Sequence, residues 1–179
     1  MKKGIIIFSG KQYSGKDTVG KIFLEQLKNF KRCAMGDIIK IQYGKEHNLT
    51  LNEVEKNKAI YRQDLINLGN WGRSQSPDYW IKRIISEPGN LIVTDVRVQH
   101  EYETFKNAGA IAIRVEATPE TRSKRGPLIG SDDVTEIGLD HIKNWDYVIN
   151  NDGSYEDLVK NSLKIIKEIE EKYVFETGL

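Results

Sequence analysis

The pattern of hydrophobic and polar positions predicts alternating strands and helices, beginning near the N-terminus. Residues 5–8 form a continuous apolar run, Ile-Ile-Ile-Phe, which is typical of a central parallel strand covered on both faces. A glycine-containing loop follows, and apolar residues then recur at helical spacing on an otherwise charged segment. These residues are Val19, Ile22, Phe23, Leu27 and Phe30. The pattern therefore predicts a strand, a loop and a helix in that order.

The same alternation continues to the C-terminus. We expect a short strand around 32–35, an amphipathic segment with Ile38, Ile39 and Ile41, and a polar region over 45–58. Two helices follow, one carrying Ile60, Leu65 and Leu68 and one spanning about 78–86. The rest reads as a strand at 90–95, a helix at 99–107, a strand at 111–115, a helix at 118–126, a loop-like stretch to about 137, a strand at 146–149 and a final helix.

Two of these helices have clear start signals. Thr118 precedes Pro119, which places an N-cap hydroxyl before a proline at the first helical position. Ser154 is a matching N-cap for the last helix, whose apolar stripe faces the core. That stripe consists of Leu158, Val159, Ile165, Ile166 and Ile169. Strands alternating with helices predict an α/β fold with a parallel sheet.

Length and composition narrow the class of protein. The chain has 179 residues, 39% hydrophobic and 30% charged, with neither a linker nor an internal repeat, so we expect one domain over 1–179. Its net charge of +1 gives no reason to expect a nucleic-acid or membrane partner. Cys33 is the only cysteine, which excludes an intramolecular disulfide and favours a reducing compartment. We see no targeting segment and expect a cytoplasmic protein.

The loop after the first strand carries the chemistry. It reads Gly10-x-x-x-x-Gly15-Lys16, a pattern in which glycines let successive N–H groups point at an anion. Lys16 adds a positive charge where the β- and γ-phosphates of a nucleotide would lie. Asp17 stands where a magnesium-binding Ser or Thr is usual, and the hydroxyl follows at Thr18. A glycine-rich turn without a ligand is the alternative, but the strand and helix around the loop favour phosphate binding.

Charged residues follow the strand NLIVTD. Asp95 ends this strand, and the carboxyl ends of parallel strands are where ligands bind in open α/β sheets. Asp95 is therefore a candidate for holding magnesium through water or for contacting substrate, or else it caps the next helix. Arg97 is a candidate for bidentate phosphate contact, with a surface salt bridge as the alternative.

Two further basic groups are candidates for substrate contact. Arg122, Lys124 and Arg125 lie on one short helix in a lid region of about 118–138, and we expect Lys124 to point to solvent. Residues 61–83 mix basic and aromatic side chains, which can hold a phosphate and cover a base or an apolar substrate. Lys40, Arg62, Arg73, Trp71 and Trp80 are the substrate candidates. Trp71 and Trp80 are alternatively core residues of two packed helices.

Zinc and serine-hydrolase chemistry find no support. His47, His100 and His141 share no ligand spacing, and the sequence has no Gly-x-Ser-x-Gly. The only Asn-Lys pair, Asn57-Lys58, is followed by Ala-Ile, so the Asn-Lys-x-Asp signature of guanine-specific switches is missing.

Several segments together resemble a known family. They are similar to segments of the deoxynucleoside monophosphate kinases of phages and bacteria, and to animal phosphomevalonate kinases. The segments are SGKQYSGKDT, AMGDIIK, YRQDLINLGNWGRSQSPDYWIKRI, LIVTDVR, TRSKRG and IGLDHIKNWDYVINNDG. The resemblance covers nearly the whole chain. It implies the nucleoside monophosphate kinase fold, a P-loop NTPase fold with a five-stranded parallel sheet between helices, an acceptor-binding region of about 36–86 and a lid.

The resemblance also implies ATP and Mg²⁺ as cofactors. Gly10 through Thr18 would cradle the ATP phosphates. The loop residues expected to contact ATP are Gly10, Lys11, Ser14, Gly15, Lys16, Asp17 and Thr18. The carboxylates available as metal ligands are Asp17 and Asp95. Adenylate-kinase-like loops also lack a hydroxyl residue at the position of Asp17. Asn150, Asn151 and Asp152, after the last strand, border the adenine or form a plain turn.

The expected reaction is in-line transfer of the γ-phosphoryl group of ATP to a phosphate oxygen. Such an acceptor is already ionised at neutral pH, so positioning and charge stabilisation replace a strong general base. Lys16, Arg97, Arg122 and Arg125 would neutralise charge, while Lys40, Arg62 and Arg73 would place the acceptor. We favour a deoxynucleoside monophosphate over phosphomevalonate, because aromatic residues lie among the arginines. An ATP-binding regulatory module is the alternative from another class, and the chain is expected to be a monomer or a homodimer.

Overall fold

A computed structural model of the chain describes residues 3–128 and 133–175. They form two compact units, one of Met1–Arg32 together with Pro88–Leu179 and one of Cys33–Glu87. The second unit nearly coincides with the region of 36–86 expected to bind the acceptor. The single domain over 1–179 stays a prediction. Within the described ranges, no helix combines the length and the apolar character that crossing a bilayer requires.

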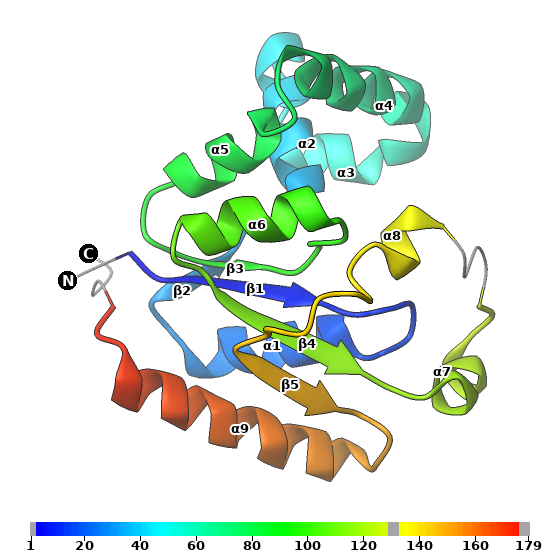
Figure 1. Cartoon of the computed structure of the whole chain (residues 1–179). Helices are drawn as coiled ribbons and strands as arrows, with labels where there is room; N and C mark the ends of the chain where they lie inside the picture. Colours follow the sequence, from blue (N-terminus) through cyan, green and yellow to red (C-terminus); the bar gives the residue numbers. More distant parts are fainter. Residues whose placement is uncertain (1–2, 129–132, 176–179) are drawn as a thin grey trace. The chain divides into compact units, whose positions relative to one another are not determined.

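The first unit contains the sheet and the helices that cover it (Figure 1). Its elements are β1 (Ile5–Ser9), α1 (Lys16–Gln26), β2 (Phe30–Arg32), β3 (Asn90–Val93), α6 (Gln99–Asn107), β4 (Ile111–Glu116), α7 (Pro119–Arg125), α8 (Val134–Ile137), β5 (Tyr147–Asn150) and α9 (Tyr155–Lys172). The strands are ordered β2-β3-β1-β4-β5 and every neighbouring pair is parallel. This confirms the predicted α/β class with a five-stranded parallel sheet.

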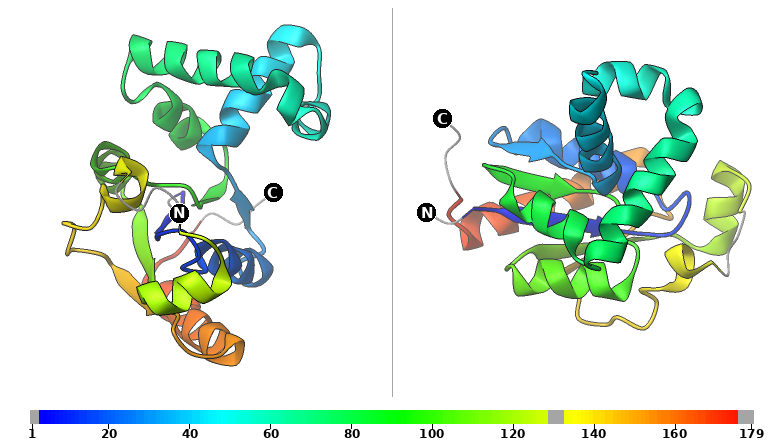
Figure 2. Two further views of the ribbon diagram at one scale, coloured as in Figure 1. Left: turned by 90° about the vertical axis from the view of Figure 1, so that its right-hand side faces the viewer. Right: turned by 90° about the horizontal axis from the view of Figure 1, so that it is seen from above.

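Helices cover both faces of this sheet (Figure 1, Figure 2). α1 and α9 pack against each other on one face, and α6 lies on the other. The core under α1 and α9 contains Phe8 of β1 and Phe23 of α1, whose rings meet edge to face at 5.0 Å. Ile166 and Ile169 of α9 are buried in the same core. The apolar stripes predicted for these two helices therefore face the sheet, except that α1 ends at Gln26 and Phe30, predicted on its stripe, belongs to β2.

Parallel pairing places the carboxyl ends of the strands at one edge. Ile6 of β1 pairs with Ile92 of β3 on one side and with Ile111 of β4 on the other. The phosphate loop after β1, the Asp95 segment after β3 and the loop after β5 therefore leave the sheet at the same edge. α7 and α8 lie beyond the arrowheads of the strands at this edge (Figure 1).

The second unit is helical. It contains α2 (Met35–His47), α3 (Leu51–Lys56), α4 (Lys58–Gln75) and α5 (Tyr79–Ser86). α3 begins with a capping box, in which the Glu53 N–H donates to Thr50 Oγ1 at 3.2 Å and the Thr50 N–H donates to Glu53 Oε2 at 2.7 Å. Hydrogen bonds from the Thr50 hydroxyl and N–H lower the pKa of Glu53. α4 and α5 confirm the two helices predicted over residues 60–86.

The two predicted N-caps are confirmed. The Thr121 N–H donates to Thr118 Oγ1 at 3.2 Å at the start of α7. The Asp157 N–H donates to Ser154 Oγ at 3.1 Å at the start of α9. Side-chain oxygens thus satisfy N–H groups that the first helical turn leaves unpaired.

Three predicted segments differ from the structure. The short strand expected around 32–35 is present but lies earlier, because β2 covers Phe30–Arg32 and α2 begins at Met35. The polar region 45–58 contains α3, and the stretch expected to be loop-like to 137 contains α8. Both α3 and α8 are too short to show a helical period of apolar residues in the sequence. Residues 129–132 of the expected lid region lie outside the described residues.

Candidate active site

The loop between β1 and α1 has the backbone shape that anion binding requires. Gly15 precedes α1 in the left-handed region, with φ 94° and ψ 10°. Tyr13 is also left-handed, with φ 58°, and the Ser14 N–H donates to the Lys11 carbonyl at 3.1 Å. These turns bring the loop back to the N-terminus of α1, where free N–H groups and the helix dipole favour an anion.

Lys16 is the first residue of α1, and its side chain is mostly buried, at 12% exposure. Its Nζ lies 3.3 Å from Asp17 Oδ1, while the Asp17 side chain itself is 78% exposed. Thr18 is partly buried one residue further on. The loop therefore keeps one cation next to the phosphate position, with a carboxylate and a hydroxyl close by in sequence.

Asn151 holds this loop from the end of β5. Its side-chain Nδ2 donates to the Ser14 carbonyl at 2.8 Å, and its own N–H donates to the Glu116 carbonyl at 2.7 Å. A Cβ on Gly15 would collide with the Asn151 amide. Asn151 is buried and bonded to the loop, a contact that the sequence did not predict, while its expected contact with adenine stays a prediction. Its neighbour Asn150 is exposed.

The arginines of α7 contact the same loop. Arg122 is buried, and its Nη1 donates to the Gln12 carbonyl at 3.4 Å. Arg125 donates to the Tyr13 carbonyl at 3.1 Å and, through Nη2, to the Asn151 carbonyl at 2.7 Å. Lys124 is exposed, as the helical spacing predicted. α7 thus places two positive charges against the phosphate loop.

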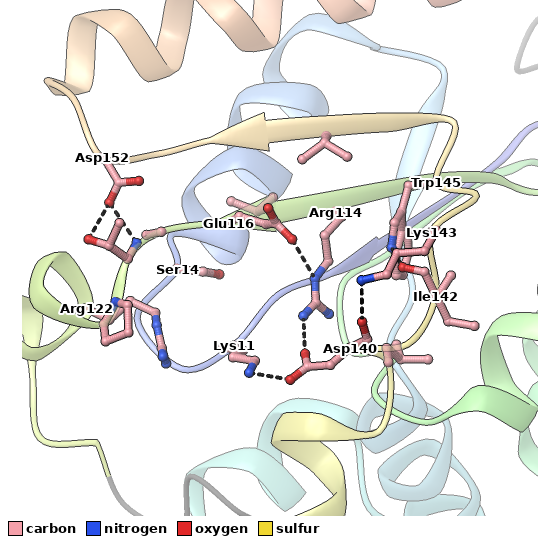
Figure 3. Close-up of a pocket in the computed structure, with 16 residues that line it drawn as sticks. Lys11, Ser14, Arg114, Glu116, Arg122, Asp140, Ile142, Lys143, Trp145 and Asp152 are labelled. Carbon is pink, nitrogen blue, oxygen red and sulfur yellow. Dashed lines mark hydrogen bonds and ion pairs between the residues drawn. The ribbon is translucent and has the colours of Figure 1, made fainter.

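A cavity of about 600 Å³ opens beside the loop, and we call it the β4 cavity (Figure 3). Lys11, Ser14 and Arg122 line it next to the loop, and Arg114 and Trp145 line it further along β4. Ser14 Oγ and Arg122 Nε are buried, and neither has a hydrogen-bond partner within the described residues. Buried polar atoms without partners are costly, so these two atoms are candidates for hydrogen bonds to a polar ligand or to water.

Asp140 links the loop to β4 across this cavity. Its Oδ2 lies 2.5 Å from Lys11 Nζ, and its Oδ1 accepts from Arg114 Nη2 at 3.0 Å (Figure 3). Arg114 is 6% exposed, donates to Ser9 Oγ at 3.0 Å and lies over the Trp145 ring at 5.6 Å. A buried charge needs such partners, so this network fixes the wall of the cavity.

Sequence reasoning missed Arg114, Asp140, Trp145 and Glu136 as site residues. Arg114 had a signal, because it is a charge among the apolar residues of the strand IAIRVE, whose other charged residue, Glu116, stands at the strand end. Asp140 and Glu136 had none, since their partners Lys11 and Gln12 lie more than 120 residues earlier in the chain. Only the tertiary fold brings these carboxylates to the loop.

Asp95 and Arg97 follow β3 at the same edge of the sheet. Asp95 is partly buried and its Oδ1 is buried. Arg97 Nη1 lies 3.6 Å from Glu136 Oε1, and the Arg97 N–H donates to Glu101 Oε2 at 2.8 Å. Among the residues described, no three His, Cys, Asp or Glu side chains form a metal-binding group. The edge thus offers single carboxylates rather than an all-protein metal cage.

The helical unit has its own cavity, of about 390 Å³, which we call the α4 cavity. Apolar side chains of Ile39, Leu65 and Ile66 form part of its wall. The polar lining residues are Lys40, Lys58, Arg62, Asn70 and Arg73. No carboxylate and no aromatic side chain belongs to the lining that the structure describes. The α4 cavity is therefore a positively charged pocket with an aliphatic wall.

Carboxylates outside this lining hold Lys40. Its Nζ lies 2.5 Å from Glu55 Oε2 and 3.2 Å from Asp37 Oδ1. Burial lowers the pKa of Lys40, but the hydrogen bonds to Glu55 and Asp37 outweigh it, so the pKa is raised. The hydrogen bond from Lys40 also lowers the pKa of Glu55. Arg62, in contrast, is exposed and has no hydrogen bond or ion pair within the described residues, and Arg73 bonds only to Asn70, at 3.1 Å.

The two tryptophans do not line this cavity. Trp80 is 1% exposed, its Nε1 donates to the Gly69 carbonyl at 3.0 Å, and a Cβ on Gly72 would lie 2.5 Å from its ring. Its predicted substrate contact is therefore wrong, because close helix packing buries the ring. Trp71 is 47% exposed and packs edge to face on Tyr79 at 5.3 Å.

Two family models match the chain. The model for phosphomevalonate kinase matches residues 8–110, and the model for deoxynucleotide monophosphate kinase matches residues 63–162. Each match covers more than half of the chain. Together they span the phosphate loop, the helical unit and the strands up to α9.

Related sequences and structures agree with this assignment. A phosphomevalonate kinase of Drosophila melanogaster is 28% identical, over 90% of this chain and 94% of its own length. A protein of Staphylothermus marinus described as a UPF0200 protein is 27% identical, over 96% of each.

Solved structures of low sequence identity show the same fold. The shikimate kinase of Aquifex aeolicus superposes with a TM-score of 0.53 at 16% identity, covering 94% of this chain and 99% of that one. The Mycobacterium tuberculosis APS kinase CysC, in complex with AMPPNP and APS, gives 0.52 at 16% identity, covering 94% and 98%. The chain is a P-loop phosphotransferase by fold and family, and it belongs to the phosphomevalonate kinase and deoxynucleotide monophosphate kinase group of P-loop kinases.

Proposed function

We propose that this protein transfers the γ-phosphoryl group of ATP to the phosphate of a small acceptor, a (deoxy)nucleoside monophosphate, and so forms a diphosphate. The observation that carries the proposal is the phosphate loop, where left-handed Gly15 and buried Lys16 form an anion site. A second positively charged pocket, the α4 cavity, gives the acceptor phosphate a place of its own.

The loop and the β4 cavity would bind ATP. Gly10 through Thr18 would surround the phosphates, with Lys16 as the central charge. Ser14 Oγ and Arg122 Nε offer hydrogen bonds that the protein itself leaves unused among its described residues. The nucleoside would extend into the β4 cavity, which Asp152 lines just after β5. The predicted contact residue Asn150 is the last residue of β5. Asn151 supports this site through the loop.

Charge stabilisation would come from residues already gathered at the loop. Phosphoryl transfer spreads negative charge over the moving group, and fixed cations stabilise it without reorganisation. Lys16, Arg97 and Arg122 are the cations that would contact this group. Arg125 donates to loop carbonyls, so it would act by holding the loop in shape. No general base is needed, because the acceptor phosphate is already ionised.

Magnesium fits the donor set at this edge. Mg²⁺ in such enzymes takes one or two carboxylates plus phosphate oxygens and water, not a closed protein cage. Asp17 and Asp95 are the carboxylates available, and the Thr18 hydroxyl lies next to Asp17. When bound, the ion would neutralise charge on the β- and γ-phosphates.

The acceptor would lie in the α4 cavity. Lys40, Arg62 and Arg73 would hold its phosphate, and the chain's match to deoxynucleotide monophosphate kinases supports a nucleotide. A second candidate is phosphomevalonate. The aliphatic wall of Ile39, Leu65 and Ile66, and the Drosophila relative, favour it.

An ADP-release assay with ATP and each candidate acceptor tests the proposal. The four deoxynucleoside monophosphates, the ribonucleoside monophosphates and phosphomevalonate are compared at equal concentration. Turnover with at least one monophosphate supports the first candidate. Turnover with phosphomevalonate alone replaces it with the second, and ATP binding without any turnover favours an ATP-binding regulatory module.

A further inference from the structure

A buried carboxylate lies against the phosphate loop. Glu136, on α8, has a side chain that is only 4% exposed. Its Oε2 accepts a hydrogen bond from the Gln12 N–H at 2.8 Å, and its Oε1 lies 3.6 Å from Arg97 Nη1. A negative charge beside an anion-binding loop opposes phosphate binding, so packing alone does not account for it.

The position of Glu136 is fixed by its own backbone. The Glu136 N–H donates to the Asp133 carbonyl at 2.8 Å, and the Ile137 N–H donates to the same oxygen at 3.1 Å. These bonds form the single turn of α8. The carboxylate thus reaches the loop from a closed turn, and its two oxygens contact two different segments, the loop after β1 and the strand end after β3.

Arg97 is held without losing its hydrogen-bonding capacity. Its backbone N–H donates to Glu101 Oε2 at 2.8 Å, at the start of α6. Its side chain is 40% exposed, and the 3.6 Å separation from Glu136 is an ion pair but too long for a hydrogen bond. The guanidinium is therefore attracted to one place while its N–H donors remain available for a phosphate.

The Gln12 N–H, in contrast, is already used in a hydrogen bond to Glu136. An amide N–H donates one good hydrogen bond, and Glu136 takes it at 2.8 Å. On the other side of the same peptide segment, the Gln12 carbonyl accepts from Arg122 Nη1 at 3.4 Å. Glu136 and Arg122 therefore hold Gln12 from both polar ends, which fixes the first half of the loop.

We propose that Glu136 is a positioning residue for phosphoryl transfer, which acts by fixing Gln12 in the loop and by holding the Arg97 guanidinium at the reacting phosphate. This rests on the proposed phosphotransferase function. The carboxylate is not a ligand of ATP. The alternative role is that the carboxylate occupies a phosphate position until ATP displaces it. Removing its charge would then tighten ATP binding, whereas the positioning role leaves ATP affinity nearly unchanged.

Glu136→Gln separates these roles. Glutamine keeps an oxygen that accepts from Gln12 but removes the charge that attracts Arg97. We expect kcat to fall by about ten- to a hundredfold, because a small displacement of a charge-stabilising group has that effect, while the Kd for ATP changes less than about twofold. Glu168→Gln on α9 is the matched control, since among the residues that the structure describes Glu168 pairs only with Lys164, at 4.0 Å on the surface.

A double-mutant cycle tests whether Glu136 acts through Arg97. Arg97→Met should lower kcat, and the double variant Arg97→Met/Glu136→Gln should be no worse than Arg97→Met alone. Additive losses, an unchanged kcat in Glu136→Gln, or tighter ATP binding in Glu136→Gln would each overturn the proposal. The last result would identify the phosphate substitute instead.

Hydrogen exchange at the Gln12 amide provides a readout that needs no turnover. We expect this amide to be protected in the wild type and in Glu136→Gln, and to exchange at least about tenfold faster in Glu136→Ala. If Glu136→Ala does not fold, the Glu136→Gln kinetics carry the test. If the wild type binds ATP but transfers no phosphoryl group to any acceptor, the proposed function fails. Faster exchange of the Gln12 amide in Glu136→Ala would still show that Glu136 holds the loop. Equal exchange in all three proteins refutes that contact.

Discussion

The side-chain amide of Asn151 donates to the carbonyl oxygen of Ser14 at 2.8 Å, which joins the end of β5 to the phosphate loop. The two residues are 137 positions apart in the chain. The same amide lies where a side chain on Gly15 would have to go. The loop is therefore shaped from outside as well as by its own glycines.

Replacing Asn151 tests this relationship. Asn151→Ala removes the shorter of two side-chain hydrogen bonds to the Ser14 carbonyl, because Arg125 Nη1 also donates to it at 3.5 Å. We expect a cost of about 0.5–1.5 kcal/mol of unfolding free energy. We also expect a higher Kd for ATP, because the loop loses its support. Chemical denaturation and calorimetric ATP titration measure the two effects. Asn161→Ala, on the exposed face of α9, is the control, and equal behaviour of the two variants would argue against the role of Asn151.

Lys16 should be essential for transfer. Lys16→Met keeps the length of the side chain but removes the charge at the phosphate position, so we expect the rate to fall at least about a hundredfold. The variant should remain folded, because within the described part of the chain Lys16 pairs only with the exposed Asp17. Lys21→Met, exposed on the same helix, provides the comparison in the ADP-release assay. Turnover by Lys16→Met near the wild-type rate would contradict the assignment of the loop.

The cations of the α4 cavity should control acceptor binding. We expect Arg62→Ala and Arg73→Ala each to raise the acceptor KM by about ten- to a hundredfold, as for lost hydrogen bonds to a charged group. The KM for ATP should stay unchanged. Lys56→Ala, exposed on α3 outside the cavity lining, is the control. A rise in the KM for ATP instead would place these arginines at the donor.

Trp80 should affect stability and not substrate binding. Trp80→Ala removes a ring that is 1% exposed and should cost about 3–5 kcal/mol of unfolding free energy. Trp80→Phe keeps most of the volume but loses the hydrogen bond from the indole N–H to the Gly69 carbonyl, so a smaller loss is expected. Thermal unfolding measures both. The acceptor KM of Trp80→Phe should equal that of the wild type, and an increase would restore Trp80 as a substrate contact.

Low pH should remove the stabilisation that the charged Asp157 side chain gives to the start of α9. Hydrogen bonds from the Ser154 hydroxyl and N–H lower the pKa of Asp157 below its ordinary value of 3.8. A carboxyl whose pKa is lower in the folded state stabilises the protein above its unfolded pKa, and this is lost as pH falls through the folded pKa. Asp157→Asn should therefore lower Tm at pH 7, with a difference that shrinks below about pH 4. A difference independent of pH would show that the charge is not involved.

Local patterns in the sequence determined the fold class, the phosphate loop and the helix caps. A continuous apolar run, a stripe at helical spacing and Gly10-x-x-x-x-Gly15-Lys16 each lie within a few residues. Short-range sterics and hydrogen bonding govern such features, so they can be read without the rest of the chain. The same holds for the two family resemblances, which depend on contiguous segments.

Tertiary structure decided which side chains serve the loop and which fill the core. Trp80 and Trp71 look alike in the sequence, yet packing buries one ring and leaves the other exposed. Glu136 and Asp140 carry no local signal, and the place of Asn151 after the last strand did not predict its contact with the phosphate loop. Parallel strands bring these segments to one edge from distant parts of the chain. The phosphate loop is thus encoded locally, while long-range packing selects the residues that hold the loop and place charges against it.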